Sequence, residues 1–131
     1  MRNKLAMTFA VATAFLLLFS SQAFAHHGTA TYDLNRTITL NGTVTNFDWG
    51  NPHCLIHLDA KDDSGKVQHW TLELASPFTL GHNGWMKASL KPGDSIAVET
   101  HPARNGLPLG ITATSGYIMK VAVNGQALPI K

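Results

Sequence analysis

The clearest structural signal in this sequence lies in residues 53–74, which read HCLIHLDAKDDSGKVQHWTLEL. Apolar side chains alternate with polar ones in the first part and again in the last, as in strands that bury one face. The intervening residues 60–66, AKDDSGK, are mostly charged or small and are typical of a turn. We therefore expect strands at 53–59 and 67–74, joined as an antiparallel hairpin.

A further strand is expected before this hairpin. Residues 36–47 carry apolar side chains at even positions as far as Val44, whereas Phe47 and Trp49 fall at odd positions. A change of parity inside one strand is the signature of an inserted residue. We therefore expect a bulge near residues 45–46.

Beyond residue 74 the alternation stops. Ser76-Pro77 is typical of a helix start, so one or two short helical turns are expected within residues 78–86. Pro92-Gly93 predicts a turn that leads into a strand at 95–100. Two Asn-Gly pairs predict further hairpins. They lie at residues 105–106 and 124–125, and the second joins strands at 117–123 and 126–130.

This order of elements predicts an all-β domain. Three strands, a short helical segment and two more strands match the OB-like arrangement, which we expect as a small five-stranded antiparallel barrel with the helical segment after the third strand. A β-sandwich is the alternative.

Residues 1–25 have the three parts of a secretory signal. Two basic residues precede an uncharged, mostly apolar run at 5–19, which is shorter than the about 20 residues that a membrane span needs. Ala23-Phe24-Ala25 follows as a small-x-small cleavage site. We expect cleavage after Ala25 and release of a single soluble domain, residues 26–131, into the periplasm.

Removal of the signal changes the charge of the chain. The 131 residues have a formal net charge of +2, whereas the 106 mature residues carry eight Lys and Arg against eight Asp and Glu. A neutral domain without a basic cluster lacks the charge that nucleic-acid or anionic-membrane binding requires. We therefore expect no nucleic-acid partner and no embedding in a membrane after cleavage.

Several short motifs stand out in the mature chain. They are His26-His27-Gly28, Gly42-Thr43-Val44, Phe47-Asp48-Trp49-Gly50-Asn51-Pro52-His53, Trp70-Thr71-Leu72-Glu73, Gly84-Trp85 and Leu90-Lys91-Pro92-Gly93-Asp94. Together they resemble a family of small exported bacterial proteins that is catalogued only as a domain of unknown function. The resemblance covers essentially the whole mature chain. It implies an exported small β-domain and carries no activity with it.

Histidine is the compositional anomaly, because all seven lie in the 106 mature residues, roughly three times ordinary usage. Cleavage after Ala25 exposes the α-amine of His26 beside its own imidazole, and His27 follows. An amine with a pKa near ~8 and an imidazole can chelate a metal ion, and nitrogen ligands favour Cu(II) over Zn(II). The alternative is that His26-His27 is only a polar terminus.

The expected hairpin brings further histidines to one face. His53 and His57 share a face of the first strand, and His69 lies on the corresponding face of the second. Two registers remain open. One sets His57 opposite His69 and His53 opposite Glu73, and the other sets His57 opposite Thr71 and His69 opposite Asp59. Either register predicts a histidine and carboxylate cluster, unless this face is simply the solvated outside of the barrel.

The loop Trp49-Gly50-Asn51-Pro52-His53 is expected to reverse the chain and to present His53 at the turn. With two further tryptophans it could frame a pocket for small apolar or sugar-like ligands, with an aromatic floor and an imidazole at the rim. The candidate ligand-binding residues are Trp49, Asn51, His53, Trp70, Glu73 and Trp85. The alternative is that the three tryptophans fill the core.

The sequence lacks the motifs of common enzymes. It has no Gly-x-Ser-x-Gly, no phosphate-binding glycine loop, no His-Glu-x-x-His and no cysteine pair spaced for zinc. The single Cys54 cannot form an intramolecular disulfide and is expected to be buried. Its neighbour His53 would point to the opposite face of the strand, so the two do not form a catalytic dyad.

The function expected from the sequence is that of a non-enzymatic, exported binding protein. In the first hypothesis the ligand is a transition metal, copper before zinc, held by His26 and His27 with a third histidine from among His53, His57 and His69. In the alternative hypothesis the protein is a small-molecule or protein-binding accessory module. It would use the aromatic loop surface and bind no metal.

Overall fold

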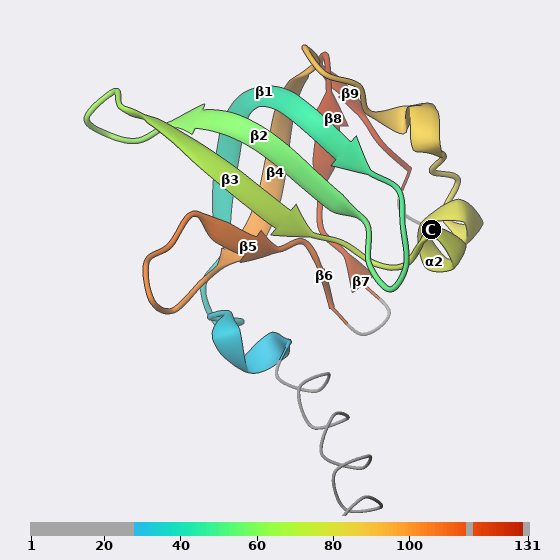
Figure 1. Ribbon diagram of the computed structural model, residues 1–131, viewed down its shortest axis with the longest axis horizontal. Helices are drawn as coiled ribbons and strands as arrows, with labels where there is room; N and C mark the ends of the chain where they lie inside the picture. The colour runs from blue at the N-terminus through green and yellow to red at the C-terminus, as the bar shows by residue number, and fades with distance from the viewer. Residues whose placement is uncertain (1–27, 115–116, 130–131) are drawn as a thin grey trace, which may run out of the picture.

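The computed structural model describes residues 28–114 and 117–129 (Figure 1), so the expected signal peptide lies outside the described residues. Within the described part, no helix is long and apolar enough to cross a membrane. The elements in chain order are η2 (Thr29–Thr31), β1 (Ile38–Asp48), β2 (Leu55–Lys61), β3 (Val67–Glu73), α2 (Pro77–His82), η3 (Lys87–Ser89), β4 (Ser95–Pro102), β5 (Leu109–Ile111), β6 (Ala113–Thr114), β7 (Tyr117–Ile118), β8 (Val121–Val123) and β9 (Gln126–Ala127).

Five strands close into a barrel in the order β1-β2-β3-β5-β4, and β4 pairs back onto β1. This order, with α2 after β3, is the OB-like arrangement that the sequence predicts. The barrel is mixed rather than wholly antiparallel, because β3 and β5 run parallel. A parallel pair needs a long crossover, and residues 74–108 provide one through α2 and β4. Closure through β1 distinguishes the barrel from the alternative sandwich.

β1 bends, and it pairs with a different strand along each of its halves. Its first half pairs with β4 and its second half with β2, and Gly42 belongs to both ladders. A β-carbon on Gly42 would lie 2.3 Å from the backbone oxygen of Asp59, so only glycine allows this approach. The register then shifts between Val44 and Asn46, which confirms the expected bulge and turns Phe47 into the core.

The hairpin of β2 and β3 has the second of the two registers left open by the sequence. His57 lies opposite Thr71, and Asp59 lies opposite His69. The tip is fixed by Asp62, whose Oδ1 accepts hydrogen bonds from the backbone amides of Ser64 and Lys66. Figure 1 shows this hairpin extending beyond the rest of the barrel.

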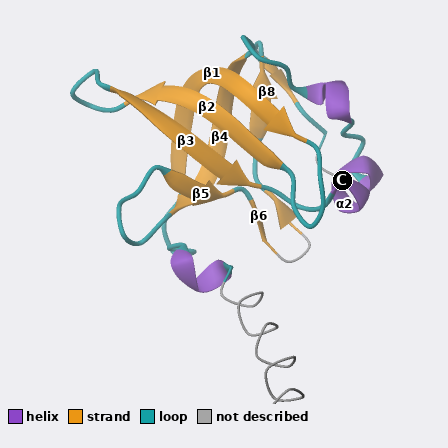
Figure 2. Cartoon of the chain, in the orientation of Figure 1, coloured by secondary structure: helices purple, strands orange, loops and turns teal. Residues whose placement is uncertain are grey.

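The short helix α2 begins as the sequence predicts. Ser76 is its N-cap and accepts a hydrogen bond from the Thr79 amide, and Pro77 occupies the first turn. Figure 2 shows the helix beside one end of the strands. Leu80 from the helix and Trp85 just after it are buried, so this segment contributes side chains to the core.

The C-terminal part differs from the expectation, and the last strand, β9, ends at Ala127 within the predicted range 126–130. The predicted strand 117–123 is divided, because Tyr117–Ile118 pairs with β6 whereas Val121–Val123 pairs with β4. The Asn124-Gly125 turn between β8 and β9 has the positive φ angles that the sequence pair predicts.

Candidate histidine and carboxylate site

Three histidines each contact a carboxylate around the outer face of β2 and β3. His53 Nδ1 contacts Glu73 Oε1. His57 Nε2 lies 2.9 Å from Asp48 Oδ2, and His69 Nδ1 lies 2.6 Å from Asp59 Oδ1. This face is solvated, as one of the sequence-based alternatives holds, and it is lined by His/carboxylate pairs.

His57 uses both of its ring nitrogens within the fold. Nε2 contacts Asp48, and Nδ1 lies 3.1 Å from Thr71 Oγ1. A carboxylate only accepts hydrogen bonds, so in the neutral ring the proton is on Nε2 and Nδ1 accepts from the Thr71 hydroxyl. No lone pair of His57 is then left for a metal ion.

His53 and His69 are arranged differently, since each bonds a carboxylate through Nδ1. The carboxylate fixes the proton on Nδ1 and leaves the lone pair on Nε2, which receives no hydrogen bond from any described residue. The side chain of His53 is 50% exposed and that of His69 is 83% exposed. Both therefore present a nitrogen that can bind an external ligand.

The carboxylate of Glu73 has a second partner that the sequence patterns do not reveal. Tyr32 Oη donates a hydrogen bond of 3.3 Å to Glu73 Oε2. The Tyr32 ring is buried in a small cluster with Ala103 and Ile111. Burial, followed by the charge and the hydrogen bond of Glu73, raises the pKa of Tyr32, so the phenol stays protonated. Tyr32 precedes the first strand and belongs to no periodic segment, which is why periodicity misses it.

The three pairs do not merge into one metal site. Among residues 28–114 and 117–129, no group of three or more His, Cys, Asp or Glu side chains is close enough to hold a metal ion. His69 and Glu73 are four residues apart in β3, about 13 Å along the strand. The predicted ligands His26 and His27 lie outside the described residues.

The predicted aromatic pocket residues are dispersed. Trp85 is buried, and its indole N–H donates to the Pro129 carbonyl at 2.9 Å. Trp49 is half-buried and meets Phe47 edge-on, with ring centroids 5.8 Å apart. Trp70 packs partly against the core on the inward side of β3, and Asn51 is exposed in the loop. All three tryptophans contribute to the core or pack against it.

Cys54 and the two other described histidines, His82 and His101, have contacts within the fold. Cys54 is fully buried, as expected, and burial raises the pKa of its thiol. His82 Nδ1 contacts the Phe78 carbonyl oxygen at 2.9 Å, and His101 Nδ1 contacts the Arg36 carbonyl oxygen at 2.8 Å. Both histidines therefore contact backbone carbonyl groups of the same chain through Nδ1.

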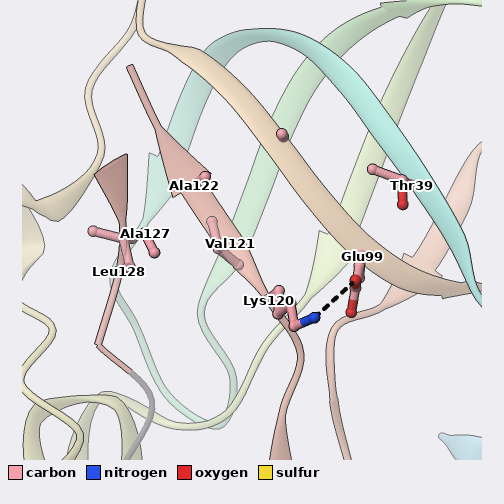
Figure 3. Close-up of a pocket in the computed structure, with 8 residues that line it drawn as sticks. Thr39, Glu99, Lys120, Val121, Ala122, Ala127 and Leu128 are labelled. Carbon is pink, nitrogen blue, oxygen red and sulfur yellow. Dashed lines mark ion pairs between the residues drawn. The ribbon is translucent and has the colours of Figure 1, made fainter. Parts of the chain in front are cut away.

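A shallow hollow of about 220 Å³ lies elsewhere, between β4 and the β8–β9 hairpin (Figure 3). Its walls are largely apolar and include Ala97, Ala122 and Leu128. An ion pair of 3.9 Å between Lys120 and Glu99 lies beside it. None of the site residues predicted from the sequence lines this hollow.

The fold and the site thus define a small OB-like barrel with exposed histidine and carboxylate pairs. Residues 13–112 match the family of unknown function DUF6152, and the chain belongs to that family. A search of curated proteins found no match, and a search of solved structures found none either. The expected resemblance to a domain of unknown function is therefore confirmed, and it brings no activity with it.

Proposed function

We propose that the protein is an exported, non-enzymatic binding protein that holds a transition metal ion, copper before zinc. The ligands are the mature N-terminal residues His26 and His27 together with His53. The observation that carries the proposal is the His53–Glu73 contact, because it leaves the Nε2 lone pair of an exposed imidazole available. Metal-binding histidines commonly bond a carboxylate through their other ring nitrogen in this way.

The described contacts favour His53 over the other two histidines as the third ligand. His57 has both ring nitrogens occupied. His69 retains its Nε2 but lies about 13 Å along β3 from Glu73, whereas Tyr32, near the start of the described chain, bonds Glu73 directly. The N-terminal segment therefore enters the fold beside His53.

The donor set determines the metal class. An α-amine and imidazoles are nitrogen ligands of intermediate softness, which suit Cu(II) first and Zn(II) second. The proposal includes export to the periplasm and removal of residues 1–25, since only cleavage after Ala25 provides the α-amine of His26. Asp59 and Glu73 on the outer face of β2 and β3 would repel phosphates, which supports the absence of a nucleic-acid partner.

Calorimetric titration of Cu(II) and Zn(II) into the protein that begins at His26 tests this function. We expect one site that binds Cu(II) more tightly than Zn(II), and weaker binding when a methionine is added before His26. His53→Asn should weaken binding, whereas the matched variant His69→Asn, which removes a similar carboxylate-bonded imidazole, should not. Absence of binding, or equal affinity with and without the added methionine, would overturn the proposal.

A further inference from the structure

The hollow between β4 and the β8–β9 hairpin exists because small side chains meet there. Ala97, Ala122 and Ala127 form one row across three neighbouring strands, since Ala97 pairs with Ala122 and Ala122 pairs with Ala127. The β-carbons of opposed residues lie about 4.5–5.5 Å apart, and methyl groups leave free the space that longer side chains would fill. Leu128 borders the row. The result is an apolar hollow of about 220 Å³ on the outward face of β4.

One end of the hollow carries a positive and a negative side chain (Figure 3). The Glu99 amide donates to the Lys120 carbonyl at 2.9 Å, so the backbone holds the two residues side by side. Lys120 Nζ and Glu99 Oε1 are 3.9 Å apart, which is too long for a hydrogen bond. Within residues 28–114 and 117–129, neither side chain forms a hydrogen bond. Because the Lys120 side chain is 76% exposed and that of Glu99 is 30% exposed, both can bond a ligand.

The volume of the hollow limits the size of its ligand. Pockets for drug-sized ligands measure about 300–1,000 Å³, so this hollow is suited to a smaller molecule. A water molecule occupies about 30 Å³ in the liquid, so a hollow of about 220 Å³ corresponds to roughly seven non-hydrogen atoms. A molecule with a short branched aliphatic part and a charged head at the Lys120–Glu99 end fits these dimensions.

We propose that this hollow binds a free aliphatic α-amino acid, such as leucine, as its zwitterion. The ligand carboxylate accepts a hydrogen bond from Lys120 Nζ, the ligand ammonium donates to the Glu99 carboxylate, and the aliphatic side chain packs against the alanine row. Each charge of the ligand then meets an opposite charge, whereas a simple anion would also meet Glu99 and a simple cation would also meet Lys120. The inference goes beyond the proposed function, because His53 and its partners do not line the hollow.

Titration of leucine into ¹⁵N-labelled protein without metal tests this inference. The amide signals of Ala97, Lys120 and Ala122 should shift along one saturable curve, while those of Cys54 and Glu73 stay in place. Three analogues each lack one part of the ligand. N-acetyl-leucine lacks the ammonium, leucine amide lacks the carboxylate, and glycine lacks the aliphatic side chain. We expect the Kd of each analogue to be at least about tenfold higher, the effect of losing one charge-assisted hydrogen bond or one buried aliphatic side chain.

Two variants test the two parts of the site. Lys120→Met keeps the aliphatic stem and removes the charge, so leucine and leucine amide should then bind equally weakly. Ala127→Leu fills the hollow and should abolish leucine binding without removing either charge. The matched control is Lys87→Met, which should bind leucine as the unmodified protein does, because Lys87 is exposed on η3, away from the hollow. Thermal unfolding of each variant checks that the fold is kept.

Three results would overturn the inference. They are the absence of shifts at the hollow with millimolar leucine, equal affinities for leucine and glycine, and binding of N-acetyl-leucine or leucine amide as tight as that of leucine, which would indicate one end of a peptide as the ligand. If a variant unfolds, the analogue series on the unmodified protein still decides the question. Copper binding is measured separately, so either proposal can fail while the other stands.

Discussion

Two buried hydroxyl groups are the least expected features at the scale of single residues. Thr100 and Thr112 are fully buried, and their Oγ1 atoms find no hydrogen-bond partner among the residues that the structure describes. Continuing the antiparallel register past His101 and Ile111 sets Thr100, in β4, opposite Thr112, which directly follows β5. An unpaired hydroxyl loses its hydrogen bonds to water on burial and gains none in return.

Replacement of one hydroxyl by a methyl group should therefore stabilise the fold. We expect Thr112→Val to raise the free energy of unfolding by about 1 kcal/mol, as measured by urea denaturation. The control is Thr71→Val, which deletes a hydroxyl bonded to His57 and should lower stability by about 1 kcal/mol. A loss of stability in Thr112→Val would mean that the hydroxyl has a partner, such as a buried water.

Single residues also show where sequence reasoning is limited. The burial of Cys54 and the N-cap at Ser76 follow from local rules. Trp85 and Tyr32 do not, because their roles depend on segments far away in the sequence, the Pro129 carbonyl and the Glu73 carboxylate. A tryptophan that fills the core and one that lines a pocket have the same sequence signature.

At the scale of elements, the β2–β3 hairpin has a loop whose conformation is fixed by hydrogen bonds of Asp62. Both registers considered from the sequence place histidines and carboxylates on one face, so the side-chain pattern alone does not choose between them. In the structure, the Asp62 amide donates to the Lys66 carbonyl, and the Asp62 carboxylate accepts from Ser64, Lys66 and Gln68. These contacts define a tight loop between the strands.

The hydrogen bonds of Asp62 make the tip sensitive to acid. Ser64 first, and then Gln68, lower the pKa of Asp62 from 3.8 to about 2. A carboxyl whose pKa is lowered by folding stabilises the fold above its unfolded pKa, and this contribution is lost as the pH falls from about 4 through 2. Asp62→Asn should therefore flatten the fall in unfolding free energy between pH 5 and pH 2, measured by urea denaturation.

Asp62 is not the only carboxylate that should lose a stabilising contact in acid, and this second contribution serves as the control. Asp94 also has a lowered pKa, caused chiefly by a hydrogen bond from Lys91 and then by one from Asn124, so some loss of stability below pH 4 should persist in Asp62→Asn. Identical pH profiles for the variant and the unmodified protein would contradict the role given to Asp62.

At the scale of the whole molecule, strand pairing depends on contacts between residues that are distant in the sequence. The alternation of apolar and polar side chains does not predict such contacts. Period and turn residues predict β1 to β4, the terminal hairpin, the bulge near residues 45–46 and the helix after β3, but no strand range for β5 or β6. They do not predict that β5 pairs parallel to β3, because that contact joins residues about 38 positions apart, such as Thr71 and Leu109. The division of the 117–123 strand has the same origin, since β7 pairs with β6 and β8 with β4.

The barrel also explains why the candidate site has its present form. Closure of the sheet gives β2 and β3 one inward face, filled by Ile56, Leu58 and Leu72, and one outward face. His57, Asp59, His69 and Glu73 lie on the outward face, whereas His53 lies just before β2 and Asp48 at the end of β1. Tyr32, near the first of the described residues, bonds Glu73, which also contacts His53, so one point on this surface combines an available imidazole with the N-terminal end of the described chain.

The most direct test of metal binding at this point is the amide spectrum of ¹⁵N-labelled protein that begins at His26, recorded as substoichiometric Cu(II) is added. The paramagnetic ion broadens the signals of nearby residues. We predict that the signals of Tyr32, Cys54 and Glu73 disappear first, while those of Ser64 and Gly65 at the hairpin tip persist. Broadening centred on His69, or none that is confined to a site, would contradict the account.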